Sequence, residues 1–430
     1  MGRLDRTAAS ISRGLGRVTG SVLGPYQSAV IRIGFSATWL LFLLRELPHR
    51  HELYGPDGPW NWDMARQLID DNHAFTVLMW FDGRGWFECV YVLSMVASAL
   101  LLLGWRTRTM SVLFMVGVLS LQNRSVFMGD GGDNVIHLMA IYLVLTRCGQ
   151  VWSLDARRRA RARGDQYASR ARGDHDPSRA RGDRFGPVLW VVLGVALIVF
   201  QLAGKVEWEW DASRPFDLLV GPLLLWGVWL GCGVHWLVQQ YAREDEPRVL
   251  VDVLGNILHN AALFVIMAEA CLIYATAGWY KIQGGRWQDG TAVYYPLHLD
   301  YFSPWPALSE LLASSGLMLM LVTYGTVAVQ VAFPFTLFNR RVKNVLLVAM
   351  ITEHAVIAVV LGLPFFSLAM IAADAVFLPT SFLRRVGGWA ERLRGRLVTG
   401  AKGRLPGPRQ HPSEEHDTEA AEHARVGFTP

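Results

Sequence analysis

The stretch that decides the fold reads VLLVAMITEHAVIAVVL (345–361), GLP (362–364) and FFSLAMIAADAVFL (365–378). Two apolar runs are separated by three residues, and glycine and proline favour a tight turn between them. The runs approach the roughly 20 apolar residues that cross a bilayer as a helix. Strands are excluded, because a segment in lipid must satisfy its backbone hydrogen bonds internally. The stretch therefore predicts a pair of antiparallel membrane-spanning helices.

The whole chain has the same character. Of its 430 residues, 52% are hydrophobic and only 18% are charged, whereas about a quarter are charged in a typical soluble protein. We therefore expect an all-α, polytopic bundle of about ten spans. The predicted spans are 27–44, 86–104, 109–122, 134–145, 187–204, 218–238, 249–277, 311–338, 345–361 and 365–378.

Arginine placement orients the spans, because basic residues concentrate in cytoplasmic loops. Segment 147–186 carries eleven Arg against five Asp, and NRRVK (339–343) is also strongly basic. Segment 45–85 has four Arg against seven acidic residues. An even number of spans places the two basic loops inside and segment 45–85 outside. Both termini are then expected in the cytoplasm.

The predicted organisation has five parts. Arg-Ala-Arg-Gly-Asp repeats three times in the linker with almost no large apolar residue, so we expect that linker to be disordered. The parts are an amphipathic cytoplasmic segment (1–26), a four-span half (27–146), the disordered Arg-rich cytoplasmic linker (147–186), a six-span half (187–379) and a mostly disordered cytoplasmic tail (380–430).

The sequence AGWYKIQGGRW (277–287) lies at the outer end of the seventh predicted span. Lys281 is one of only four lysines among 41 basic residues, and Lys205 is the other that is predicted outside. An arginine would suffice for lipid contact, but it cannot lose its proton. A desolvated lysine can lose one and act as a base. The alternative is a lysine that reaches the interface within an aromatic belt.

Two further clusters carry polar residues into predicted spans. In FMGDGGDNVIH (127–137), Asp133 or Asn134 can cap a helix, and His137 lies one turn deeper, where it could exchange protons or hydrogen-bond a neighbouring helix. Glu353-His354 lies in the middle of the ninth span, where a carboxylate must be paired or protonated. A structural contact between helices is the competing interpretation for Glu353, and Glu269 raises the same question.

Three motifs carry a resemblance to a known family: AGWYKI (277–282) with Trp287 and Gly290, His354 with LGLPFF (361–366), and VWSLD (151–155). On these motifs the chain resembles the horizontally transferred transmembrane domain (HTTM) family, which includes the vitamin K-dependent gamma-glutamyl carboxylase. The resemblance implies a shared membrane domain in which the residue matching Lys281 deprotonates a reduced quinone.

The resemblance has departures. Asn134 falls near the position where the family has a histidine, and His137 is one turn further along. The family's large lumenal domain has no counterpart, and spans five and six look inserted.

The sequence favours a quinol-dependent redox or carboxylating membrane enzyme. Lys281, Asn134 and His137 would be catalytic, while Trp279, Tyr280, Trp287 and His354 would bind a menaquinone- or vitamin K-type quinol. One alternative is a non-enzymatic protein that binds a quinone, a lipid or a secreted peptide; another is a transporter that depends on Glu269 or Glu353. We expect a bacterial cell membrane location, the bilayer as partner, no nucleic acid and no metal site.

Overall fold

The computed structural model describes residues 3–72, 74–171, 185–205, 222–241 and 245–402. The secondary structure of these residues is entirely helical, which confirms the predicted all-α class. The chain divides into two compact units, Met1–Thr380 and Ser381–Pro430. The second unit holds most of helix α19 (Thr380–Lys402).

Every predicted apolar run overlaps helical structure in the described residues, although the run 311–338 is interrupted at Ser314 and Ser315. Within the described part of the chain, five helical segments are long and apolar enough to cross a membrane, or six if the bent pair that starts at Pro364 counts as one span; three further helices are apolar but shorter. The chain is therefore a multi-span helical membrane protein. The helices are α2 (Pro25–Glu46), α5 (Arg84–Leu103), α6 (Thr107–Arg124), α7 (Gly131–Leu145), α9 (Phe185–Leu202), α11 (Pro222–Tyr241), α12 (Asp245–Gln283), α16 (Gly316–Ala332), α17 (Arg340–Val360) and α18 (Pro364–Asp374).

Short helices fill the connections. Helix α1 (Arg3–Gly20) covers most of the predicted amphipathic segment 1–26. The others are η1 (Leu47–His49), α3 (Arg50–Tyr54), α4 (Trp62–Asn72), η2 (Val77–Trp80), η3 (Val126–Met128), α13 (Gly285–Gln288), α14 (Tyr294–Leu297), η5 (Asp300–Phe302), α15 (Pro306–Ala313), η6 (Phe333–Thr336) and η7 (Ala375–Phe377).

The predicted disorder of the linker 147–186 is wrong for residues 154–171, whereas the mostly disordered tail at 380–430 stays a prediction. Helix α8 (Leu154–Ala171) covers the first Arg-Ala-Arg-Gly-Asp repeat, and α19 extends through Lys402. The linker has no residues for a core, but Arg, Ala and Gln are strong helix formers. The Ser153 hydroxyl accepts a hydrogen bond from the Ala156 N–H at 2.9 Å and caps the helix start. Residues 172–184 and 403–430 lie outside the described residues.

The core lies where α2 packs against α5, α7 and α18. Arg32 of α2 is fully buried there. Its guanidinium donates to the carbonyls of Leu101 and Leu102, of Cys148 and of Trp152. The arginine thus hydrogen-bonds to carbonyls left free at the end of α5 and holds the VWSLD segment beside them through the Trp152 carbonyl.

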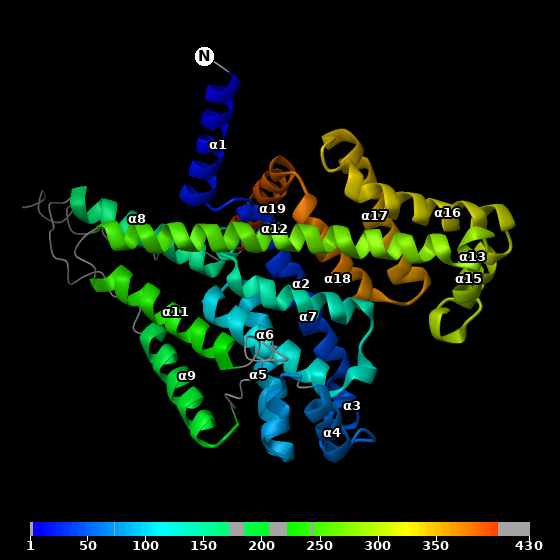
Figure 1. Ribbon diagram of the computed structural model, residues 1–430, viewed down its shortest axis with the longest axis horizontal. Helices are drawn as coiled ribbons and strands as arrows, with labels where there is room; N and C mark the ends of the chain where they lie inside the picture. Colours follow the sequence, from blue (N-terminus) through cyan, green and yellow to red (C-terminus); the bar gives the residue numbers. More distant parts are fainter. Residues whose placement is uncertain (1–2, 73, 172–184, 206–221, 242–244, 403–430) are drawn as a thin grey trace, which may run out of the picture. The chain divides into compact units, whose positions relative to one another are not determined.

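Helix α12 runs past α1, α7 and α16 (Figure 1). Its 39 residues give a length of about 58 Å, nearly twice the ~30 Å hydrocarbon thickness of a bilayer. In its N-terminal half, Asn256 and Asn260 donate to carbonyls of the last turn of α1 and of the residue that follows it. His259 accepts from the Arg147 N–H. The opposite end of α12 carries Lys281.

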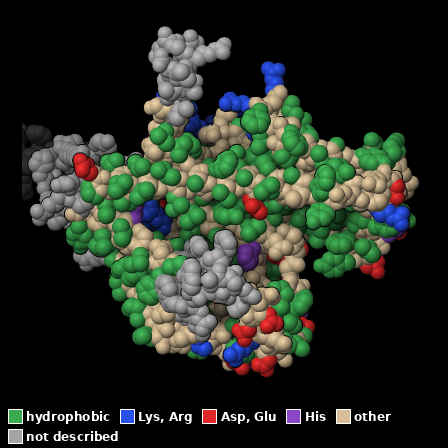
Figure 2. All heavy atoms as spheres, in the orientation of Figure 1, with side chains coloured by type: hydrophobic (Ala, Val, Ile, Leu, Met, Phe, Trp, Pro, Cys, Tyr) green, Lys and Arg blue, Asp and Glu red, His purple; other side chains and the backbone are tan. Residues whose placement is uncertain are grey.

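Many large apolar side chains are exposed on these helices, including Phe264, Leu321 and Val348 at 60–70%. Figure 2 shows hydrophobic side chains over most of the visible face, with acidic and basic side chains gathered near α3 and α4. Such a surface suits contact with lipid hydrocarbon.

Candidate functional site

A chain of hydrogen bonds starts at Lys281 near the end of α12. The Lys281 ammonium donates to Gln330 Oε1 of α16 at 2.6 Å, and Gln330 Nε2 donates to Glu353 Oε1 of α17 at 2.7 Å. The Gln330 side chain is only 4% exposed. The Gln330 amide of α16 therefore connects the amine of Lys281 on α12 with the carboxylate of Glu353 on α17.

A second polar group lies beside this chain. The hydroxyl of Tyr274 is 3.1 Å from His354 Nε2, and both residues are buried. Asp374 of α18 is fully buried next to Tyr274. His354 Nδ1 has no hydrogen-bond partner among the described residues. Glu353 and His354 are consecutive residues of α17, so the two polar groups lie side by side and form one polar network.

Gly278 of the AGWYKI motif and Gly290 in the loop that follows explain how α12 reaches this position. A Cβ on Gly278 would lie 2.6 Å from Val331 Cγ2, so only glycine allows α12 to approach α16 next to Gln330. Gly290 has a φ of 77°, which glycine adopts most readily. Its loop is held by Asp289, where hydrogen bonds from Thr291 keep the pKa of the exposed carboxyl below its usual value.

Only one of the three predicted aromatic residues contacts Lys281. The ammonium lies 4.9 Å from the centre of the Trp287 ring, within the range of a cation–π interaction. Trp279 and Tyr280 are 60% and 74% exposed. They precede Lys281 by two residues and by one, and such neighbours point to other sides of a helix. They face outward, whereas His354 lies inside the network.

Asn134 and His137 line a separate cavity of about 360 Å³. His137 Nδ1 is 3.0 Å from Gln122 Oε1 of α6. The cap of α7 is Asp130, which forms a reciprocal capping box with Asp133, so the expectation that Asp133 or Asn134 is the cap is wrong by three or four residues. No hydrogen bond or ion pair within the described residues connects this cavity to Lys281.

The start of α18 lies between the two groups. The Phe366 ring is 5.5 Å from the His354 ring, and a Cβ on Gly132 of α7 would lie 2.5 Å from Phe366 Cα. Phe365 contacts the ring of Phe42 at 5.6 Å, and Phe42 lines the cavity. The LGLPFF segment therefore separates the two clusters and contacts both.

Sequence reasoning missed Gln330, Tyr274 and Asp374. Tyr274 could have been found, because it precedes Lys281 by seven residues and so shares a helix face with it. Gln330 is a lone amide in an apolar run, which marks a paired group in a membrane helix. Of the other predicted polar residues, Glu269 is half-buried near Tyr142, and the Lys205 ammonium lies 5.3 Å from the Phe81 ring.

The comparisons with known proteins give one distant similarity. The chain is 29% identical over 148 residues to the uncharacterized protein YitO of Bacillus subtilis (strain 168). The similarity covers 34% of this chain and 45% of YitO. No protein family profile matches the chain, and no solved structure matches it. The similarity therefore connects this membrane protein to a bacterial relative.

Proposed function

We propose that the chain crosses a bacterial cell membrane ten times with both termini in the cytoplasm. Contacts between connections support this topology on the predicted inner side. Asp155 accepts hydrogen bonds from the backbone N–H groups of Arg106 and Thr107, and Arg147 pairs with Asp252 at 3.0 Å. The first contact joins two segments that the topology places inside, and the second joins one of them to the inner end of the seventh predicted span.

The outer side is equally consistent. Trp60 contacts Phe127 at 4.9 Å between ring centres, and Ser125 donates to the Leu53 carbonyl. These residues belong to connections that the topology places outside. A tag inserted at Asp174, between the linker repeats, should be protected from external reagent in intact cells. Labelling of that tag without permeabilisation would show that the orientation is the reverse of the one proposed.

At the outer end of α12 we propose an HTTM-like site that accepts a proton from a quinol. The observation that carries it is the Lys281–Gln330–Glu353 chain. Gln330 Oε1 orients the amine, and the nearby Glu353 carboxylate would stabilise the ammonium that forms when the amine accepts a proton. Because the amine is partly buried under Trp287, its charged form loses hydration, which favours a lysine that can act as a base.

A reduced quinone fits these residues in two respects. Trp287 offers a ring next to the Lys281 amine, and His354 Nδ1 is a buried polar atom with no partner in the described chain. Lys281, Trp287 and His354 would hold the quinol, which supplies an acidic hydroxyl on an oxidisable ring. In its neutral form, the Lys281 amine would take that proton and become an ammonium, while Gln330 fixes the position of the nitrogen.

The competing function is a non-enzymatic protein that binds a quinone, a lipid or a secreted peptide. The Gln330 amide favours it, because an amide that donates to Glu353 and accepts from Lys281 also holds both charges in a static pair. In that case the charge of Lys281 matters and its proton does not. Lys281→Arg distinguishes these functions, since arginine keeps the charge but does not release a proton.

The test measures bound menaquinone and oxygen consumption with added menaquinol in detergent-purified full-length protein. Proton acceptance predicts that Lys281→Arg abolishes menaquinol-dependent oxygen consumption, while the matched variant Lys205→Arg leaves it unchanged. Equal consumption by wild type and Lys281→Arg favours the binding function. If menaquinone neither co-purifies nor binds when added, the quinol proposal fails.

A further inference from the structure

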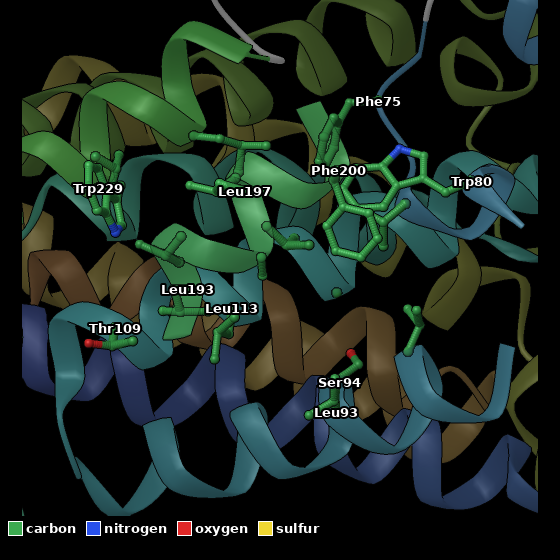
Figure 3. A pocket seen from close by; sticks show the side chains of 18 of the residues that line it. Phe75, Trp80, Leu93, Ser94, Thr109, Leu113, Leu193, Leu197, Phe200 and Trp229 are labelled. Atoms are coloured by element: carbon green, nitrogen blue, oxygen red, sulfur yellow. The ribbon is translucent and has the colours of Figure 1, made fainter. Parts of the chain in front are cut away.

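An apolar cavity of about 230 Å³ lies between α5 and α6 on one side and α9 and α11 on the other (Figure 3). For comparison, a cavity of about 150 Å³ lined by apolar side chains stays dry and can bind benzene. Figure 3 shows the side chains of Leu193, Leu197 and Phe200 on α9 among the lining residues. The described residues around it also include Phe75, Val77, Trp80, Trp86, Leu113 and Trp229.

Three indole N–H groups of the cavity wall already have hydrogen-bond partners, and the hydroxyl groups among the lining residues are those of Ser94 and Thr109. The indole N–H groups of Trp190 and Trp229 each donate to the other residue's carbonyl at 2.9 Å. The Trp86 indole donates to the Val77 carbonyl at 2.8 Å. A polar ligand would lose its hydration in this cavity without replacement hydrogen bonds to these indoles. The cavity therefore suits hydrocarbon.

A second, larger cavity of about 660 Å³ adjoins the first. Val112, Val228 and Cys232 line both cavities. The second cavity also contains Arg108, which is exposed. Within the described residues, no hydrogen bond or ion pair engages the Arg108 guanidinium. The Arg108 guanidinium, whose nearby acidic group is the Asp252 carboxylate that pairs with Arg147, thus opens onto a space that continues into the apolar cavity.

The surroundings of Arg108 carry an excess of positive charge. Arg147 lines the same cavity and is paired with Asp252. Arg158 and Arg159 line a third cavity of about 280 Å³ that also includes Arg108. The acidic residue of this third cavity, Asp155, already accepts backbone hydrogen bonds at the start of α6. In Figure 2, basic side chains next to a histidine lie just below α12, left of centre.

We propose that these adjoining cavities bind one anionic phospholipid, with its phosphate at Arg108 and an acyl chain in the aromatic cavity. Guanidinium groups bind phosphate through charge-assisted hydrogen bonds, and the indole-lined cavity accepts only the chain. The ten-span topology places these arginines on the cytoplasmic side, where anionic lipids provide a negative surface. The site shares no residue with the Lys281 network, so either proposal can fail without the other.

The experiment uses full-length protein in neutral detergent, titrated with dioleoyl phosphatidylglycerol or dioleoyl phosphatidylcholine and read by native mass spectrometry. Because the acyl chains are identical, a difference in Kd reports the head group. We expect phosphatidylglycerol to bind at least tenfold more tightly. Arg108→Gln should remove about a tenfold advantage, equivalent to about 1.4 kcal/mol. Arg340→Gln, an exposed arginine of the same predicted side, should not change it.

The acyl chain has its own matched pair of variants. Leu197→Trp fills the cavity, whereas the neighbouring Ile198 is 47% exposed and does not line it, so Ile198→Trp is the control. We expect Leu197→Trp to weaken binding of the dioleoyl lipid severalfold and Ile198→Trp to have no effect. Helical circular dichroism and a single gel-filtration peak identify the variants that fold.

Equal affinity for the two lipids would overturn the proposal, as would unchanged binding in folded Arg108→Gln. Inorganic phosphate is the third probe. If it displaces phosphatidylglycerol at equal concentration and Leu197→Trp binds normally, the arginines form a site for soluble anions and the lipid is not its ligand.

Discussion

Replacement of Gln330 by leucine tests the polar network directly. The side chain makes two hydrogen bonds to charged groups, to Lys281 at 2.6 Å and to Glu353 at 2.7 Å. Leucine has a similar size but forms neither bond. Hydrogen bonds to charged groups contribute about 1.5 kcal/mol or more each. We therefore expect Gln330→Leu to lower the free energy of unfolding by about 3 kcal/mol, a large fraction of the ~5–15 kcal/mol of a folded domain.

The loss should arise from the stranded charges, and a triple variant shows whether it does. Lys281→Met, Gln330→Leu and Glu353→Leu together replace the network by apolar side chains, which is often neutral or stabilising for a buried ion pair. The triple variant should therefore recover most of the lost stability. Because recovery requires no activity, this result is independent of the function proposed for Lys281.

Unfolding in mixed micelles of mild detergent and sodium dodecyl sulfate gives the free energies. Thr323→Val is the matched control on the same helix, since Thr323 is fully buried and its hydroxyl has no partner among the described residues. It should be neutral or stabilising. If Gln330→Leu is as stable as wild type, or if the triple variant is less stable than Gln330→Leu, the network does not balance its charges as described.

Three further substitutions probe positions that hold the helices together. Arg32→Met should severely reduce the yield of folded protein, because it leaves several buried carbonyls without a hydrogen-bond donor. The yield is measured as the area of the folded peak in gel filtration. Asp155→Asn should lower the Tm modestly, because it weakens the cap of α6, and such a cap contributes about 1 kcal/mol to stability. An unchanged Tm would show that the cap is dispensable. Gly132→Ala should lower the thermal stability of the protein, because the new Cβ forces Phe366 away. The control Gly85→Ala places its Cβ where no atom lies within 4 Å and should be tolerated. Equal thermal stability of the two variants would contradict the close approach of α7 and α18.

The sequence alone determined where the helices lie. Each predicted apolar run overlaps helical structure in the described residues, because a run that must remain in hydrocarbon can satisfy its backbone only within itself. The same local physics also explains the error at 154–171. The absence of large apolar side chains from this segment excludes a hydrophobic core. It does not exclude a helix, because Arg and Ala are strong helix formers.

Only the tertiary structure decided which polar residues meet. Lys281 and Gln330 are 49 positions apart, and Tyr274 and His354 are 80 apart, so helical periodicity cannot pair them. The pairing depends on how α12, α16, α17 and α18 pack, and small residues such as Gly278 allow the close approach. The sequence can show that a polar residue in a membrane helix needs a partner, because desolvation is costly. The partner itself is chosen by the packing of helices that are distant in sequence.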